Sequence, residues 1–529
     1  MLFKMTAKEL FARKTSGIVR EIEWYDALTM MIAQICIGAS FMTVAYDMSY
    51  LYPGFDPVIS LTATAVILLI ATLTMLQLAA IMPRTGGDYV INTRILKIPA
   101  IGFASNFMLV IFEVAASAMF LVFIGSWGLT AVLTVVNLPP LVDFFASPEG
   151  MMLVLTIGVI YWFILMSSGT KKAFMWNFIL VIFSMIGIII FLVLLAGTTR
   201  AGFINEFNAY ASSYGIGSYG YQYIIDKARE LTGFTYPSVF LWPATLASFS
   251  YTIWCYWGNF GGFWWSGEVK RPARTLLIGM LGSLAISWAV LVLLCLLTNN
   301  VMGLDFMYSF RTLFSDFPAY YPFSVAPNVL FLATVLTKNP IIQFFVFSGF
   351  IGWLIAGPVA FLMVATRSIF AWSFDRLIPA KLSEVKTRFR VPVYLYALVA
   401  VITWIIGVMY IYTAWVNVIN ILALATTSLI FVGISALIVP WTRKDLYEVA
   451  PPFVKLKVGP VPLITIFGAF TACFSLYLTL AALLVSTVEQ VCFYLGAIVV
   501  GLVVFYISRY MNKRRGIDVD LIYKTVPPT

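Results

Sequence analysis

The sequence contains no histidine and few charged residues. Charged side chains make up 11% of its 529 residues, whereas hydrophobic side chains make up 61%. Soluble globular domains carry roughly 25% charged and about 45–50% apolar residues. So few charges could not cover the surface of a soluble protein of this length. A water-soluble enzyme, a disordered chain and a nucleic-acid-binding domain are therefore poor fits, and we expect a polytopic membrane protein.

Residues and motifs that support common chemistry are also missing. Without histidine, no imidazole can act as a proton shuttle, a metal ligand or a pH switch. The five cysteines form no CxxC pair, so neither a disulfide framework nor a zinc site is indicated. No GxxxxGKS or GxxxxGKT phosphate loop occurs, which argues against ATP-driven work. We expect no metal and no cofactor. Since the apolar stretches hold no paired carboxylates, we also expect no enzymatic activity.

Long apolar runs dominate the chain instead. A membrane-spanning helix needs about 20 predominantly apolar residues. Twelve stretches meet this requirement, at residues 25–51, 57–81, 99–126, 151–168, 173–197, 241–267, 275–298, 341–367, 393–412, 414–440, 459–485 and 488–510. Because they show no alternating strand pattern, they predict an all-α polytopic membrane protein and not a barrel.

The lysines and arginines assign the loops to the two sides of the membrane. If the N-terminus is inside, only Arg200, Lys227, Arg229, Arg311 and Lys338 of the 33 basic residues fall in outer loops. Basic loops stay in the cytoplasm, so both termini are predicted there, and the chain is predicted to cross the cell membrane many times. The basic loops are interpreted as topology determinants and contacts with membrane lipids, not as nucleic-acid sites.

These spans and sides predict the following division of the chain. A cytoplasmic segment, residues 1–24, precedes the first five spans, residues 25–197. An outer insert, residues 198–240, leads to spans six to ten, residues 241–440, which contain a second outer insert, residues 299–340. The last two spans lie within residues 441–510, and a cytoplasmic tail covers residues 511–529.

Two spans contain residues that favour an interrupted helix. Small and polar side chains between Ala33 and Ser40 occupy the middle of the first span, and three glycines with Asn259 interrupt the sixth. Glycine costs a helix about 1 kcal/mol relative to alanine. Interrupted spans in corresponding halves of a transporter point to a binding site at the midplane. Freed N–H groups there can hold a carboxylate, and freed C=O groups can hold a cation.

A simpler interpretation is that small residues only let helices pack closely. Two such spans, five apart, favour discontinuity over packing. Because five is odd, spans 6–10 would begin on the opposite side of the membrane from spans 1–5, which gives two inverted repeats. The halves share little sequence identity, so the repeat is inferred from the matched interruptions.

Three loop motifs resemble those of the amino acid–polyamine–organocation (APC) transporters. Residues Pro83–Tyr89 read PRTGGDY, similar to the family's P-x-S/T-GG-x-Y signature. Residues Gly267–Pro272 are similar to E-x-K-N/R-P, and Arg367–Pro379 to R-x-x-x-A-x-x-x-D-x-x-x-P. The tail from Gly516 resembles that of prokaryotic members, archaeal ones among them. The resemblance covers about residues 20–528, and its motifs follow in order in the expected cytoplasmic loops.

This resemblance implies a fold and a site. The fold would be two inverted five-helix repeats with discontinuous helices 1 and 6, plus two extra helices. An amino acid or related amine would bind between the broken helices, its carboxylate held by N–H groups of the first break and its body stacked on Trp254. The substrate-binding residues implied by position are Ala33, Gln34, Ile35, Cys36, Ile37, Gly38, Ala39, Ser40, Ser117, Trp254, Cys255, Gly258 and Phe361.

Glu113 is the one acidic residue that falls in a span interior. An acid there costs about 2.5–3.5 kcal/mol on insertion scales and is a functional hypothesis by default. It lies one helical turn from Ser117. Two roles are open, a proton acceptor for coupling and a counter-charge for a substrate amine. A neutral acid that is hydrogen-bonded in the bundle is the alternative.

The same family places other coupling devices at positions that this chain leaves apolar. Sodium-coupled relatives use serine or threonine on span 8, but residues 353–358 contain neither. Some proton-coupled relatives use a lysine inside span 5, and residues 173–197 contain none. At the inner end of span 6, Trp264 and Trp265 are expected to face lipid in an interfacial belt.

The function implied is secondary transport of amino acids or related amines by alternating access, as a proton symporter or an exchanger. A non-transporting membrane subunit or an amino-acid sensor with the same fold is the alternative, because fold alone does not fix function. The substrate's identity, the coupling, the direction and the oligomeric state stay open at this point.

Overall fold

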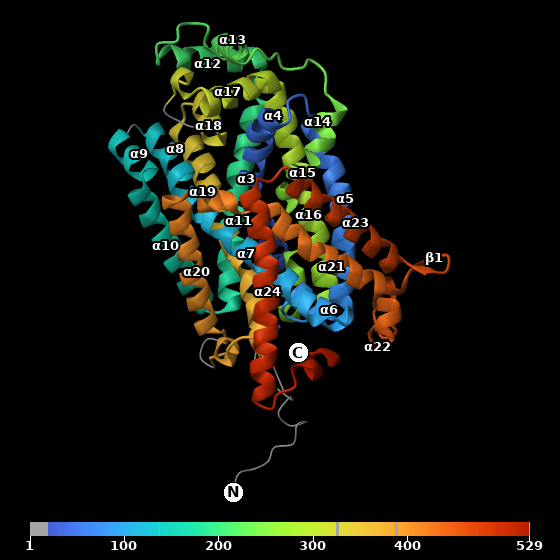
Figure 1. Cartoon of the computed structure of the whole chain (residues 1–529). Helices are drawn as coiled ribbons and strands as arrows, with labels where there is room; N and C mark the ends of the chain where they lie inside the picture. The colour runs from blue at the N-terminus through green and yellow to red at the C-terminus, as the bar shows by residue number, and fades with distance from the viewer. Residues whose placement is uncertain (1–19, 137, 324–326, 387–389, 528–529) are drawn as a thin grey trace.

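The computed structural model describes residues 20–136, 138–323, 327–386 and 390–527, which form a bundle of long helices (Figure 1). The predicted N-terminal segment before Arg20, Arg388 of a basic loop and Pro528 of the tail lie outside these residues. Among the described residues, ten helices are long, apolar and unbroken enough to cross a membrane: α5 (Pro57–Ile81), α7 (Pro99–Phe123), α10 (Pro148–Ser167), α11 (Thr170–Ala196), α16 (Pro272–Met302), α19 (Pro340–Phe374), α20 (Val393–Tyr412), α21 (Ile421–Thr442), α23 (Leu463–Leu484) and α24 (Val488–Arg514). The protein is thus an all-α polytopic membrane protein, as predicted.

The first span has the length and hydropathy of a crossing helix but is built from pieces. The helix α2 (Trp24–Ile35) ends at Cys36, whose backbone is left-handed with φ 51° and ψ 62°. The chain then resumes as α3 (Ile37–Met42), a π-helical turn (Thr43–Asp47) and α4 (Met48–Leu51). A non-glycine residue in this conformation interrupts the helical hydrogen bonds. The discontinuity predicted for the first span is therefore confirmed.

The sixth span is interrupted over a longer stretch. It begins as α14 (Trp242–Ala247) and α15 (Phe249–Thr252) and tightens into a 3₁₀ turn (Ile253–Tyr256). Residues 257–260 are not helical, and two further 3₁₀ turns (Gly261–Phe263 and Ser266–Glu268) complete the crossing. Close packing of an intact helix, the simpler interpretation of its glycines, does not describe this segment.

The two halves of the bundle repeat the same order of elements. In the first half, the broken span is followed by α5, the short helix α6 (Gly87–Ile95) and then α7, α10 and α11. In the second half, the broken span is followed by α16, the short helix α17 (Leu304–Asp316) and then α19, α20 and α21. This order is that of two five-helix units with two extra helices, α23 and α24.

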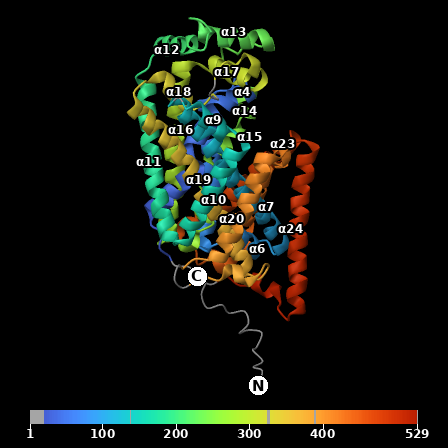
Figure 2. The same ribbon diagram turned by 90° about the vertical axis from the view of Figure 1, so that its left-hand side faces the viewer.

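The helices at the centre differ from those at the edge in burial. The first span, α7 and α19 are buried over most of their length, whereas α10, α11, α20 and α24 expose leucine, isoleucine and valine side chains toward the lipid. Figure 2 shows α11 and α24 at opposite edges of the bundle. The centre of the protein is therefore the contact region of the first span, α7 and α19 with the broken sixth span.

Both outer inserts fold into short helices that cover one end of the bundle (Figure 1). The first insert forms α12 (Arg200–Ser212) and α13 (Gly220–Thr232), and the second contributes α17 and α18 (Val329–Leu336). Aromatic rings join them: Phe306 of α17 lies 4.9 Å from Phe207 and 4.7 Å from Tyr221, centroid to centroid. We call these four helices the outer cap, after the side of the membrane on which the inserts are predicted to lie.

Several span boundaries differ from the predicted ones: the eighth crossing continues to Phe374, past residue 367, and the tenth helix begins at Ile421 and not at residue 414, because a 3₁₀ turn (Ala414–Val418) precedes it. The third crossing continues past residue 126, through a π-helical turn (Ile124–Leu129) and α8 (Thr130–Val135). The eleventh begins at Leu463 and not at residue 459, because the chain first forms a hairpin of β1 (Lys457–Val458) and β2 (Val461–Pro462). Gly459 turns this hairpin with φ 59°, and Pro462 directly precedes α23.

Two glycine substitutions are predicted to have opposite effects, one at the close contact of α23 with α21 and the other on α24. A Cβ at Gly468 of α23 would lie 2.5 Å from the Leu437 nitrogen of α21, whereas a Cβ at Gly496 of α24 would meet nothing within 4 Å. Gly468→Ala should destabilise the purified protein by about 1–3 kcal/mol through overpacking. Gly496→Ala should stabilise it or leave it unchanged, since alanine favours a helix by about 1 kcal/mol. Thermal unfolding in detergent measures the stability of both variants. Equal melting temperatures would contradict the close contact between α23 and α21.

Candidate functional site

The two interrupted spans meet at the side chain of Gln34. Gly258 has φ +119°, and a Cβ there would lie 2.6 Å from the Gln34 Cβ. A Cβ at Gly261 would lie 2.2 Å from the Gln34 side-chain oxygen. Gly258 therefore requires glycine, because of its φ and because the Gln34 backbone carbon would lie 2.8 Å from a Cβ there. At Gly261 a Cβ would instead displace the end of the Gln34 side chain from the space between the breaks. The predicted site residues Gln34 and Gly258 are thus in direct contact.

Glu113 of α7 completes this contact from a third helix. Its carboxylate accepts hydrogen bonds from the Gln34 side-chain amide, at 3.2 and 3.5 Å, and from the Trp257 indole N–H, at 3.5 Å. The side chain is fully buried, and within the described part of the chain no cation pairs with it. Each interrupted span thus supplies one N–H donor to a single carboxylate in the bundle interior.

Aromatic side chains surround this polar centre. The Phe112 ring lies 5.3 Å from Trp254, 5.2 Å from Trp257 and 6.1 Å from Phe361 of α19, centroid to centroid. Trp254 is partly exposed, whereas the other three are buried. Ser117 lies one turn along α7 and donates its hydroxyl to the Glu113 carbonyl at 2.8 Å. The structure therefore brings Trp254, Phe361 and Ser117 to the same region as Glu113.

The remaining residues of the first break contact α19 and the sixth span. The Cys36 thiol lies 3.5 Å from the Trp353 carbonyl oxygen, and Gly38 packs against the Trp353 ring. Ser40 donates its hydroxyl to the Ile35 carbonyl at 2.8 Å, and its own carbonyl lies 3.7 Å from the Cys255 thiol. The other predicted residues of this stretch are buried or, for the last, partly exposed: Ala33, Ile37 and Ala39.

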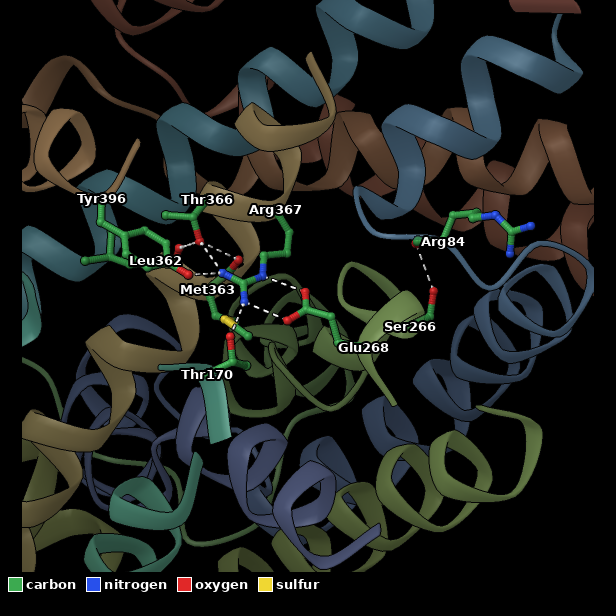
Figure 3. A network of polar contacts seen from close by, with 9 residues as sticks. All are labelled: Arg84, Thr170, Ser266, Glu268, Leu362, Met363, Thr366, Arg367 and Tyr396. Atoms are coloured by element: carbon green, nitrogen blue, oxygen red, sulfur yellow. Dashed lines mark hydrogen bonds and ion pairs between the residues drawn. The ribbon is translucent and has the colours of Figure 1, made fainter. Parts of the chain in front are cut away.

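Below this centre, a buried ion pair joins the motif that follows span 6 to span 8. Arg367 of α19 donates from Nε and Nη2 to the two carboxylate oxygens of Glu268, both at 2.7 Å (Figure 3). Its guanidinium also donates to the Tyr396 hydroxyl at 2.8 Å and the Thr170 hydroxyl at 3.2 Å. Both charged side chains are nearly inaccessible. A bidentate pair satisfied by further hydrogen bonds fixes the relative positions of four spans.

The motif after span 2 is held in the same layer. Its Asp88 accepts hydrogen bonds from the Trp264 indole, Asn106 and Ser428, each at 2.6 Å. Burial raises the pKa of the Asp88 carboxyl to about 6, although these hydrogen bonds act in the opposite direction. The Ser266 hydroxyl donates to the Arg84 carbonyl at 3.0 Å (Figure 3). We call this layer of motif residues the inner network.

Trp264 and Trp265 do not face lipid, so that expectation was wrong. Their exposed fractions are 0% and 1%. Trp264 bonds Asp88, and the Trp265 ring packs edge-on against Phe174 at 5.3 Å. Because the helix of span 6 ends near Tyr256, the residues beyond it fold into the bundle rather than continuing along its lipid-facing side.

On the opposite side, the outer cap closes over the first span. Arg311 of α17 donates to Asp47 at 2.9 Å, and the Tyr50 hydroxyl donates to Asp316 of α17 at 2.7 Å. Polar contacts between motif residues therefore bind the helices together on one side of Glu113, and contacts of the outer cap do so on the other.

Sequence reasoning missed Trp257 and Phe112, which contact the centre directly. Trp257 directly precedes Gly258, so its place in the break was a usable signal. Nothing in the local sequence distinguishes its indole from the nine other aromatic rings of the sixth span. Which of them bonds Glu113 depends on the non-helical path of residues 257–260.

Comparison with known sequences agrees with this architecture. The family described as amino acid permease matches residues 22–505, which is nearly the whole chain. No curated protein matches the sequence. The matched region contains both broken spans, Glu113 and all three loop motifs. The chain therefore belongs to the amino acid permease family, of the APC superfamily.

Proposed function

We propose that the protein is a secondary transporter that moves an amino acid or a related amine across the cytoplasmic membrane by alternating access, with both termini in the cytoplasm. The observation that carries this proposal is the Glu113 carboxylate, to which Gln34 and Trp257 of the two interrupted spans both donate. Interrupted helices meeting around a buried polar group are the arrangement by which transporters of this kind bind small solutes.

In this proposal the two ends of the substrate meet different chemistry. The first N–H groups of the helix that resumes after Cys36, at Ile37 to Ala39, would hold the carboxylate, since the Ser40 N–H already donates to the Cys36 carbonyl. Glu113 would accept the ammonium, which would replace the amide of Gln34 as its hydrogen-bond donor. Trp254 would stack on the substrate, since its ring is partly exposed and lies beside Phe112.

Glu113 is also the proposed coupling group. A buried carboxyl without a cation is more stable when protonated, and a bound ammonium favours the ionised form. Binding of the amine and loss of the proton would then be linked, which yields proton coupling or amine exchange. Residues 353–358 lack the hydroxyls that sodium-coupled relatives use, and residues 173–197 lack the lysine that some proton-coupled relatives use. Those positions therefore offer no alternative coupling group to Glu113.

Alternating access would require the contacts of the inner network and those of the outer cap to separate in turn. The Arg367–Glu268 pair and its neighbours would separate to open the inner side, and the Arg311–Asp47 pair would separate to open the outer side. The Arg367 and Glu268 side chains are 3% and 1% exposed, whereas those of Arg311 and Asp47 are 25% and 24% exposed. Opening the inner side would accordingly require the more deeply buried pair to become solvated.

Uptake into proteoliposomes tests the proposal as a whole. Purified protein is reconstituted, and accumulation of a panel of labelled amino acids and amines is measured with and without an imposed pH gradient. Accumulation that follows the pH gradient supports symport, and uptake that needs an internal amino acid supports exchange. Saturable binding with no flux under either condition would instead favour a sensor or a non-transporting subunit.

Glu113→Gln should abolish the pH dependence of uptake and weaken substrate affinity roughly ten- to hundred-fold. This range corresponds to the loss of a hydrogen bond to a charged group, about 1.5–3 kcal/mol. The glutamine keeps the size of the side chain, so packing against Gln34 and Trp257 is retained. The measurement is initial uptake rate against external pH, together with the apparent KM. Glu206→Gln on the exposed face of α12 is the matched control. A Glu113→Gln profile that overlays the unmodified protein's would remove Glu113 from both roles.

Trp254→Leu should raise the KM for an amine substrate roughly two- to thirty-fold, the range of a lost cation–π contact of about 0.5–2 kcal/mol. Trp242→Leu in α14 removes an indole that is 57% exposed and serves as the control. Equal KM values for the two variants would show that Trp254 does not contact the substrate.

A further inference from the structure

A large cavity lies at the foot of the bundle, away from Glu113. Its volume is about 710 Å³. The lining comes from the junction of α6 and α7, the end of α21, the last turns of α24 and the 3₁₀ helix Val519–Lys524 of the tail. In Figure 1, α6, α22 (Lys444–Tyr447) and the foot of α24 lie at the same end of the molecule. The tail therefore builds one wall of a cavity whose other walls belong to the bundle.

The lining carries an excess of positive charge. Five basic side chains line the cavity with two acids: Arg94, Lys97, Arg443, Arg509 and Lys524 against Asp445 and Asp520. Each acid is already bonded to an arginine of the lining, Asp445 to Arg443 at 2.7 and 2.9 Å and Asp520 to Arg509. The Arg443 guanidinium lowers the pKa of the Asp445 carboxyl, which stays charged. In the described part of the chain, Lys97 and Lys524 are exposed and form no ion pair.

Arg94, which lines the cavity, has a buried donor that no described residue satisfies. Its side chain is 1% exposed, and its Nη2 pairs with Asp375 at 2.8 Å. Its Nη1 donates to Thr93 at 2.7 Å. Its Nε is buried and has no acceptor among the residues that the structure describes. Buried donors are nearly always satisfied, so this N–H of a lining residue needs an acceptor from outside the protein, either a water or a ligand atom.

The rest of the lining is apolar or aromatic. Phe505 and Tyr506 of α24 and Ile98 at the start of α7 form one side. The Tyr523 ring lies 5.4 Å from the Arg94 guanidinium carbon. A ligand that suits these walls therefore combines a strong anionic acceptor with an apolar or planar part.

We propose that this cavity is a binding site for a phosphate-bearing ligand. Arginine and lysine together favour an anion such as phosphate over a neutral solute. A guanidinium with a free N–H can bond a phosphate oxygen. The volume lies in the range of small-molecule sites, about 300–1,000 Å³. The same chemistry is available from the headgroup of an anionic phospholipid and from a soluble phosphorylated compound.

Occupancy of this site would act on the inner network through Arg94. Its partner Asp375 also accepts a hydrogen bond from Tyr89 at 2.7 Å, and both lie in loop motifs of the inner network. A ligand that bonds Arg94 and Lys524 together would tie the tail to α6. It would thereby stabilise the state in which the inner side is closed. This inference concerns a site separate from that of the transported solute, and its test does not depend on transport.

Binding of two probes to the full-length protein tests the site. In one arm, protein in detergent is titrated with phosphatidylglycerol or phosphatidylcholine, and lipid adducts are counted by native mass spectrometry. In the other arm, inorganic pyrophosphate is titrated by calorimetry. The test variant is Lys97→Ala with Lys524→Ala, two exposed positions that should not affect folding. The control, Lys172→Ala with Lys457→Ala, removes the same charge from exposed lysines outside the cavity.

We expect one probe to bind and the Lys97→Ala, Lys524→Ala variant to bind it about ten-fold more weakly or worse, while the control binds like the unmodified protein. A preference for phosphatidylglycerol would identify a lipid site, and binding of pyrophosphate would identify a soluble ligand. Failure of both probes to bind, or an equal loss in test and control variants, would overturn the proposal. Arg94 itself is left unchanged, because its substitution would leave the buried Asp375 carboxylate without its ion-pair partner.

Discussion

The hydrogen bonds that Gln34 and Trp257 donate to Glu113 are the contacts on which the centre of this protein depends. Backbone that leaves a helix within a membrane is tolerated only where other groups satisfy it or where it lines a cavity. Here the two departures from helical structure lie against each other, and one carboxylate is shared between them. Gly258 is needed because Gln34 occupies the volume that a side chain there would take, and Gly261 leaves room for the end of the Gln34 side chain.

The same principle explains why the three loop motifs lie together on one side of this centre. Each motif brings a polar group that would be costly to bury alone: Asp88, Glu268 and Arg367. Glu268 and Arg367 satisfy each other, and Asp88 takes three hydrogen bonds from other spans. Motifs that are far apart in sequence are thus parts of a single layer, so a change in one of them would alter the surroundings of the others.

Much of this arrangement can be predicted from the sequence, but some of it cannot. The spans and the two interruptions are visible in sequence because apolar length and clustered glycine act locally. Gln34 and Gly258 were assigned to one site by the resemblance to the family, and Glu113 was placed near it because it lies one helical turn from Ser117. The part played by Trp257 and the burial of Trp264 were not predictable, because periodicity gives side-chain direction only inside a regular helix. Beyond Tyr256 the direction of each ring is set by tertiary contacts.

The outer cap has a consequence for how a solute would reach the central site. The helix α17 reaches over the first span, and rings from α12 and α13 hold it there. A solute arriving from that side would meet packed aromatic rings and the Arg311–Asp47 ion pair before it reached Glu113. Its entry would accordingly depend on movement of the cap, so the cap as well as the central site would determine which compounds pass.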